Sequence, residues 1–98
     1  MKQILVVDDD RTARYLLSRT LRAAGFSVST AQDGLSGLQQ LRKKTYDLVL
    51  LDIWMPRMNG LELLAQMRLE DQHPKAVVMT SDQTPETLLR AEIGRAHV

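Results

Sequence analysis

Two short apolar segments of this chain end abruptly in aspartate, and this pattern limits the folds open to it. Residues 4–7 are followed by three aspartates beginning at Asp8, and residues 48–51 are followed by Asp52. Both segments have the length and composition of buried strands, and the interior of a strand excludes an unpaired charge. The aspartates must therefore lie where the strands emerge from the core. If the two strands are parallel neighbours, their carboxylates meet at one edge of a sheet.

The composition is that of one small domain. The chain has 98 residues, of which 44% are hydrophobic, and its 13 basic and 12 acidic residues leave a formal charge of +1. This balance lacks the basic excess typical of a nucleic-acid-binding domain. The absence of cysteine excludes a disulfide framework and indicates a reducing compartment. The first apolar run is far too short for a signal sequence or a membrane span. We expect a cytoplasmic protein that contacts neither nucleic acid nor membrane.

Strand-like and helix-like segments alternate along the chain. Strands are expected at residues 4–7, 26–29, 47–51 and 76–79. Three helices are predicted from apolar spacing, with faces made by Ala13, Leu16, Leu17, Leu21 and Ala24, by Leu35, Leu38 and Leu41, and by Leu61, Leu64 and Met67. Gly25 is a stop signal suited to a left-handed C-cap, and a fourth helix is expected to begin at residues 84–86. The pattern predicts parallel strands joined by right-handed helical crossovers.

This alternation predicts an α/β fold, an open parallel sheet with helices on both faces. In such sheets, ligands bind beyond the carboxyl ends of the strands, near the point where the strand order reverses. Asp8, Asp9, Asp52 and Thr80 all fall at carboxyl ends of expected strands. A cluster of carboxylates repels itself unless a hard cation such as Mg2+ lies among them. The sequence therefore predicts a divalent cation site at this edge.

Three segments together resemble the receiver domain of bacterial two-component response regulators, namely residues 4–10, 47–60 and 77–81. They contain an acid pair at a strand end, Asp52 followed by Met-Pro-x-Met-Asn-Gly, and Thr80 at a later strand end. The resemblance covers residue 2 to about residue 91. It implies a flavodoxin-like sheet with strand order 2-1-3-4, in which the fifth strand and fifth helix of the family are missing.

The resemblance also implies a function for the site. Asp52 would accept a phosphoryl group from a histidine kinase or phosphotransfer protein. Asp8, Asp9, Asp52 and the backbone carbonyl of Trp54 would hold Mg2+, and the Thr80 hydroxyl would bind the phosphoryl oxygens. Such a domain is a phosphorylated switch that assists its own phosphotransfer, not an ordinary enzyme. The resemblance is compatible with an output domain in a longer protein, outside this chain, and also with no further domain.

The end of the chain departs from the family pattern. Receiver domains carry a lysine at the end of the fifth strand, and its usual spacing places it beyond Val98. Residues 93–98 match an in-frame translation of a common DNA-sequencing adapter. We therefore expect residues 1–91 to form a partial receiver domain and residues 92–98 to be a non-native tail.

Other interpretations of the same residues remain open. An acidic run can simply cap a helix, and this is the preferred interpretation of Asp10. A scaffold or binding module could use the same fold without phosphotransfer. A phosphatase of the haloacid dehalogenase type also uses an aspartate nucleophile, but it requires a second aspartate two residues later, where this chain has Trp54.

Overall fold

The computed structural model describes residues 2–52, 60–71, 74 and 76–80, and for residues 76–80 it describes the backbone. The elements along the chain are β1 (Gln3–Val7), α1 (Arg11–Ala23), β2 (Ser27–Ala31), α2 (Gly34–Lys43), β3 (Leu48–Asp52), α3 (Gly60–Leu69) and β4 (Ala76–Thr80). All four expected strands and the first three expected helices are confirmed, with ends shifted by one or two residues. The predicted fourth helix and the Trp54 carbonyl lie outside the described residues.

The four strands form one parallel sheet with the order β2-β1-β3-β4, as expected. From β1 the chain crosses to β2 on one side and later returns to β3 on the other side, so the strand order reverses between β1 and β3. Val7 pairs with both Ala31 and Leu51, and Asp52 pairs with Thr80. The register therefore brings the carboxyl ends of β1, β3 and β4 to the same edge.

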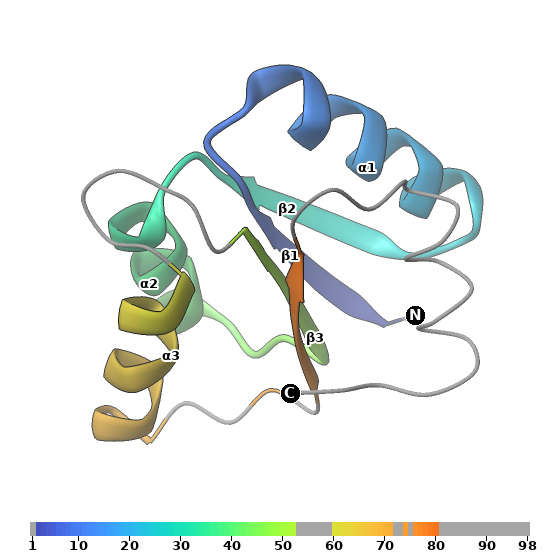
Figure 1. Ribbon diagram of the computed structural model, residues 1–98. Helices are drawn as coiled ribbons and strands as arrows, with labels where there is room; N and C mark the ends of the chain where they lie inside the picture. Colours follow the sequence, from blue (N-terminus) through green and yellow to red (C-terminus); the bar gives the residue numbers. More distant parts are fainter. Residues whose placement is uncertain (1, 53–59, 72–73, 75, 81–98) are drawn as a thin grey trace.

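Helices cover both faces of this sheet (Figure 1). Successive side chains of a strand point to opposite faces, and the side chains of β1 divide between the two faces in this way. Leu5 and Val7 belong to the cluster that α2 and α3 cover, whereas Ile4 and Val6 belong to the cluster under α1. Burial on both faces explains why β1 and β3 are apolar without alternation. The prediction of an open sheet between two helical layers is confirmed.

Helix α1 begins and ends at sequence signals. The Asp10 carboxylate accepts a hydrogen bond from the backbone N–H of Thr12, which confirms Asp10 as the N-cap. At the other end, Gly25 has a φ of +96°, and its N–H donates to the Arg22 carbonyl while the N–H of Phe26 donates to the Leu21 carbonyl. This pair of bonds is the Schellman motif. It turns the chain directly into β2.

The expected apolar helix faces are partly wrong. Leu16, Leu35 and Leu61 are 47%, 39% and 60% exposed, and Ala24 is exposed as well. In α3, Met67 is buried and Leu64 packs against the core as expected, but the other buried residues are Gly60 and Leu63, not Leu61. Nearly every turn of this helix carries leucine or methionine, so two overlapping faces satisfy the same spacing. The rotation of α3 against α2 and the sheet selects the face that contains Leu63.

Close packing between α2 and the sheet depends on Gly37. A Cβ atom at this position would lie 3.0 Å from Val7 Cγ2 and 3.4 Å from Leu63 Cδ2. Contacts this short leave no room for a side chain unless the neighbours move. Gly37 therefore lets α2 approach both β1 and α3, which supports the strand end that carries Asp8.

Two leucines of α3 provide a direct test of this packing. Replacing Leu63, which is fully buried, by alanine is expected to lower the free energy of unfolding by about 2–5 kcal/mol. Leu61→Ala in the same helix should change it by less than about 0.5 kcal/mol, since Leu61 is 60% exposed. Chemical denaturation of both variants measures the difference. Equal losses would show that the assigned helix face is wrong.

An ion pair joins α2 to the residue after α3. The Arg42 guanidinium donates to both carboxylate oxygens of Glu70, at 2.7 and 2.5 Å. Hydrogen bonds from Arg42 and from Gln66 lower the pKa of Glu70 to about 2. The sequence indicates only a solvated helix end at Arg42, so this contact is a tertiary feature.

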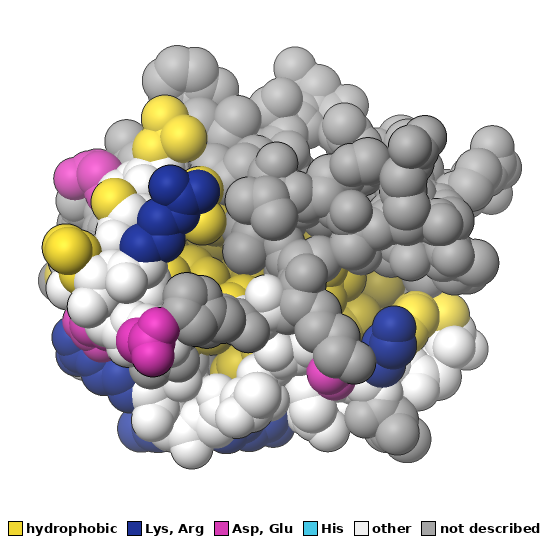
Figure 2. Space-filling view, turned by 90° about the horizontal axis from the view of Figure 1, so that it is seen from below, with side chains coloured by type: hydrophobic (Ala, Val, Ile, Leu, Met, Phe, Trp, Pro, Cys, Tyr) yellow, Lys and Arg dark blue, Asp and Glu magenta, His cyan; other side chains and the backbone are white. Residues whose placement is uncertain are grey.

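Charges of both signs are mixed on the surface. On the described part of the face in Figure 2, Lys and Arg side chains lie next to Asp and Glu side chains, with hydrophobic side chains among them. This mixture agrees with the balanced composition. Within the described ranges, no helix combines the length and apolar character that crossing a membrane requires.

Candidate functional site

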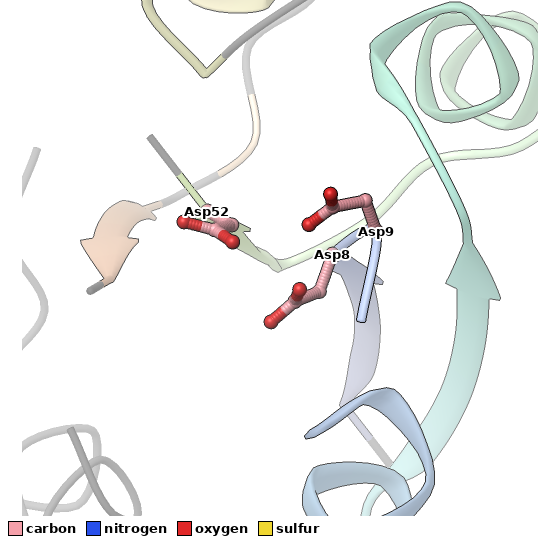
Figure 3. A group of neighbouring side chains, drawn as sticks. All are labelled: Asp8, Asp9 and Asp52. Carbon is pink, nitrogen blue, oxygen red and sulfur yellow. The ribbon is translucent and has the colours of Figure 1, made fainter. Parts of the chain in front are cut away.

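Three carboxylates meet at the carboxyl edge of the sheet. Asp8 and Asp9 follow β1, and Asp52 is the last residue of β3. One carboxylate oxygen from each residue lies within 4.8 Å of the others. Figure 3 shows the side chains of Asp8 and Asp9 extending from the end of β1 toward the side on which Asp52 lies. The predicted convergence of these acids is therefore present in the fold.

The backbone around Asp8 is held by hydrogen bonds from three directions. Its N–H donates to the carbonyl of Ala31 at the end of β2, at 3.1 Å. Its side-chain Oδ1 accepts from the N–H of Asp10 at 2.9 Å, and its carbonyl accepts from the Arg14 guanidinium at 2.9 Å. Because each bond comes from a different element, the position of Asp8 depends on the sheet, the loop and α1 together.

The electrostatics of the cluster are unfavourable in the metal-free protein. The pKa of Asp8 is raised from 3.8 to about 6, mainly because the carboxylate is partly buried. The charge of Asp52, a hydrogen bond between the Asp8 and Asp52 carboxyl groups and the charge of Asp9 raise it further. The hydrogen bond from the Asp10 N–H opposes this rise. An ionised Asp8 is thus destabilised where it stands, and a bound cation would reverse that preference.

The donor set fits a hard divalent cation. Three carboxylates offer oxygen ligands only, at an edge where Asp8 and Asp52 are half-buried and Asp9 is exposed. Mg2+ is bound in proteins by one or a few carboxylates while it keeps several waters, and the exposed side of the cluster leaves space for them. The described residues can therefore hold such an ion through Asp8, Asp9 and Asp52.

The other expected site residues are placed less completely. Thr80 pairs with Asp52 in the register of β3 and β4, so its backbone lies beside the central acid. Its hydroxyl and the Trp54 carbonyl fall outside what the structure describes.

Sequence reasoning missed Arg14, whose only signal is its place in the first turn of a helix that directly follows the acid pair. Its contact with Asp8 depends on how α1 packs on the sheet.

Comparison with known proteins shows the family to which this chain belongs. The family model for the response regulator receiver domain matches residues 4–97. A CpxR homologue of Haemophilus influenzae is 39% identical over 94 residues, which cover 96% of this chain and 41% of that protein. The response regulator MprA of a Mycobacterium species (strain KMS) is 41% identical over 93 residues, covering 94% of this chain and 40% of that protein.

Solved structures show the same fold. The chemotaxis protein CheY4 of Vibrio cholerae matches with a TM-score of 0.79 and 32% identity, over 99% of this chain and 83% of that chain. The response regulator TrrA of Thermotoga maritima matches with a TM-score of 0.76 and 29% identity, over 95% of this chain and 98% of that chain.

The family model, these relatives and the open parallel sheet together define a signalling receiver of two-component systems. The chain belongs to the response regulator receiver domain family. It spans about two fifths of the length of the curated relatives given above.

Proposed function

We propose that this domain is a phosphorylatable switch in which Asp52 is the phosphoacceptor. The observation that carries the proposal is the convergence of Asp8, Asp9 and Asp52 within 4.8 Å, with Thr80 in register beside Asp52. Of the three acids, Asp52 is the one that pairs with a residue of β4, and that residue is Thr80. In this proposal the Thr80 hydroxyl binds a phosphoryl group carried by Asp52.

The reaction is an in-line phosphoryl transfer. A carboxylate oxygen of Asp52 attacks the phosphorus, a P–O bond forms, and the P–N bond to the histidine of the donor breaks. The released imidazole nitrogen takes up a proton. Transfers of this kind require positioning and neutralisation of charge more than covalent chemistry by the protein. The product is an acyl phosphate on aspartate.

Each remaining residue has a part in this proposal. Asp8, Asp9, Asp52 and the carbonyl of Trp54 would hold Mg2+, which would supply positive charge that offsets repulsion between the acids and the incoming phosphoryl group. Thr80 donates its hydroxyl to the phosphoryl oxygens and so couples modification to the neighbouring strand end. The solved structure of TrrA from Thermotoga maritima, a complex with Mg2+-BeF, supports a magnesium-dependent site in this fold.

The partners follow from the same assignment. A histidine kinase or a phosphotransfer protein supplies the phosphoryl group in the cytoplasm, and an output domain of a longer protein reads the switch. The relatives support this view because their names describe transcriptional or response regulators of more than twice this length. The domain itself needs no contact with nucleic acid or membrane, and it acts as a switch and not as an ordinary enzyme.

A small phosphodonor tests the proposal without knowledge of the kinase. Incubation with acetyl phosphate and Mg2+ is expected to add one phosphoryl group that hydroxylamine removes, as it does from acyl phosphates. Omission of Mg2+ with a chelator present should prevent the modification. Intact-protein mass spectrometry measures both results. A folded protein that binds Mg2+ but stays unmodified would favour the scaffold interpretation instead.

A further inference from the structure

Helix α1 makes two similar contacts with the sheet, one at each end. Near its beginning, the Arg14 guanidinium donates to the carbonyl of Asp8 at 2.9 Å. In its last turn, the Arg22 guanidinium donates to the carbonyl of Val28 in β2 at 3.0 Å. Both contacts tie an arginine of the same helix to a backbone oxygen six residues away in sequence. Only the first reaches the acid cluster.

The carbonyl that Arg14 contacts belongs to the peptide bond between Asp8 and Asp9. A peptide unit is planar and rigid, so this oxygen, the Asp9 N–H and the Asp9 Cα move together. The Asp8 N–H is already bonded to Ala31. With the carbonyl bonded as well, both backbone polar groups of Asp8 are held, which restricts the position from which the exposed Asp9 carboxylate extends.

We propose that Arg14 is a positioning residue of the cation site, holding the Asp8–Asp9 peptide so that both carboxylates face Asp52. This inference rests on the proposed function, since it assumes that the three acids bind a divalent cation. Arg14 touches neither the cation nor the phosphoryl group in this assignment. It acts through the backbone, as groups around metal ligands commonly do.

A simple electrostatic role for Arg14 predicts the opposite effect. A guanidinium beside a cation site repels the cation, so removal of the charge alone would tighten Mg2+ binding. Removal of a positioning contact would instead weaken binding, because the two carboxylates would no longer be held in place before the ion arrives. The direction of the change therefore distinguishes the two roles.

Paired substitutions in α1 make the test. Arg14→Met is expected to weaken Mg2+ binding about tenfold, within the range found for groups around metal ligands. Arg22→Met removes the same charge and a similar bond from the same helix, and it should leave the dissociation constant within about twofold of wild type. Arg14→Lys keeps a donor and the charge and should recover part of the affinity. Calorimetric titration with Mg2+ at fixed ionic strength gives each value, and thermal unfolding checks that each variant is folded.

The outcomes separate this inference from the function on which it rests. If the wild-type protein is folded and does not bind Mg2+, the proposed function fails. If wild type binds Mg2+ and Arg14→Met binds it equally or more tightly, only the role of Arg14 is overturned. If Arg14→Met does not fold, Arg14→Lys decides the matter. Weaker binding by that variant supports the inference, and wild-type affinity overturns it.

Discussion

Replacing Asp8 by asparagine is expected to weaken Mg2+ binding strongly and, at the same time, to stabilise the metal-free protein at neutral pH. The first effect follows from the loss of one of three clustered carboxylate ligands. The second follows from the environment of Asp8, where burial and the neighbouring acids raise its pKa to about 6. Asparagine keeps an oxygen that can accept the Asp10 N–H. The substitution therefore removes a charge while preserving the local hydrogen bond.

The sign of the stability change depends on pH. Asp8 binds its proton more tightly in the folded state, so its contribution to stability is complete below pH 3.8 and is lost as the pH rises through about 6. A rise in pKa from 3.8 to about 6 corresponds to about 3 kcal/mol. Because Asp8 is only half-buried, screening by solvent reduces this to about 1–2 kcal/mol.

Thermal unfolding of the metal-free proteins measures this effect. The Tm of Asp8→Asn should exceed that of wild type by at least about 4 °C at pH 7.5, and the two values should converge near pH 4. At pH 7.5, a Mg2+ concentration just sufficient to saturate wild type should raise the Tm of wild type but not that of Asp8→Asn. Asp10→Asn is the matched control, since it removes a neighbouring acid but keeps a good N-cap residue. A pH-independent difference, or Mg2+ stabilisation of Asp8→Asn equal to that of wild type, would contradict the assignment.

The second large effect concerns Asp52. Asp52→Asn should reduce phosphorylation by acetyl phosphate more than about a hundredfold, because an amide oxygen is a poor nucleophile for phosphorus. Asparagine has nearly the shape of aspartate, and Asp52 ends a strand paired with both β1 and β4. We therefore expect the fold to be retained, which circular dichroism can verify.

A comparison of three variants separates the nucleophile from the metal ligands. Asp8→Asn should also lose phosphorylation, but high Mg2+ concentrations should restore part of it because Asp52 is still present. Asp52→Asn should stay unmodified at every Mg2+ concentration, and Asp10→Asn should react like wild type. Mass spectrometry of peptides locates any remaining phosphoryl group. Undiminished modification of Asp52→Asn at another residue would overturn Asp52 as the phosphoacceptor.

Much of the site could be predicted because one topological rule governs it. Parallel strands joined by helical crossovers all point their carboxyl ends to the same edge. Once the strand pattern was recognised, the acids after β1 and the acid that ends β3 could therefore be predicted to lie close together. The same rule placed Thr80 next to Asp52. The cap residues Asp10 and Gly25 were also predictable, since capping depends on a few adjacent residues.

What the linear sequence determined by itself is thus the order of elements, their caps and the edge at which the acids gather, since each depends on local spacing or on strand direction. Tertiary packing alone decided which of the competing leucines of α3 is buried, and it placed Leu63 inside and Leu61 outside. It also brought Arg14 to the carbonyl of Asp8 and Arg42 to Glu70. These features depend on how far each helix is rotated and how closely it approaches its neighbours. Several rotations satisfy the same apolar spacing, and only the packed core selects one of them.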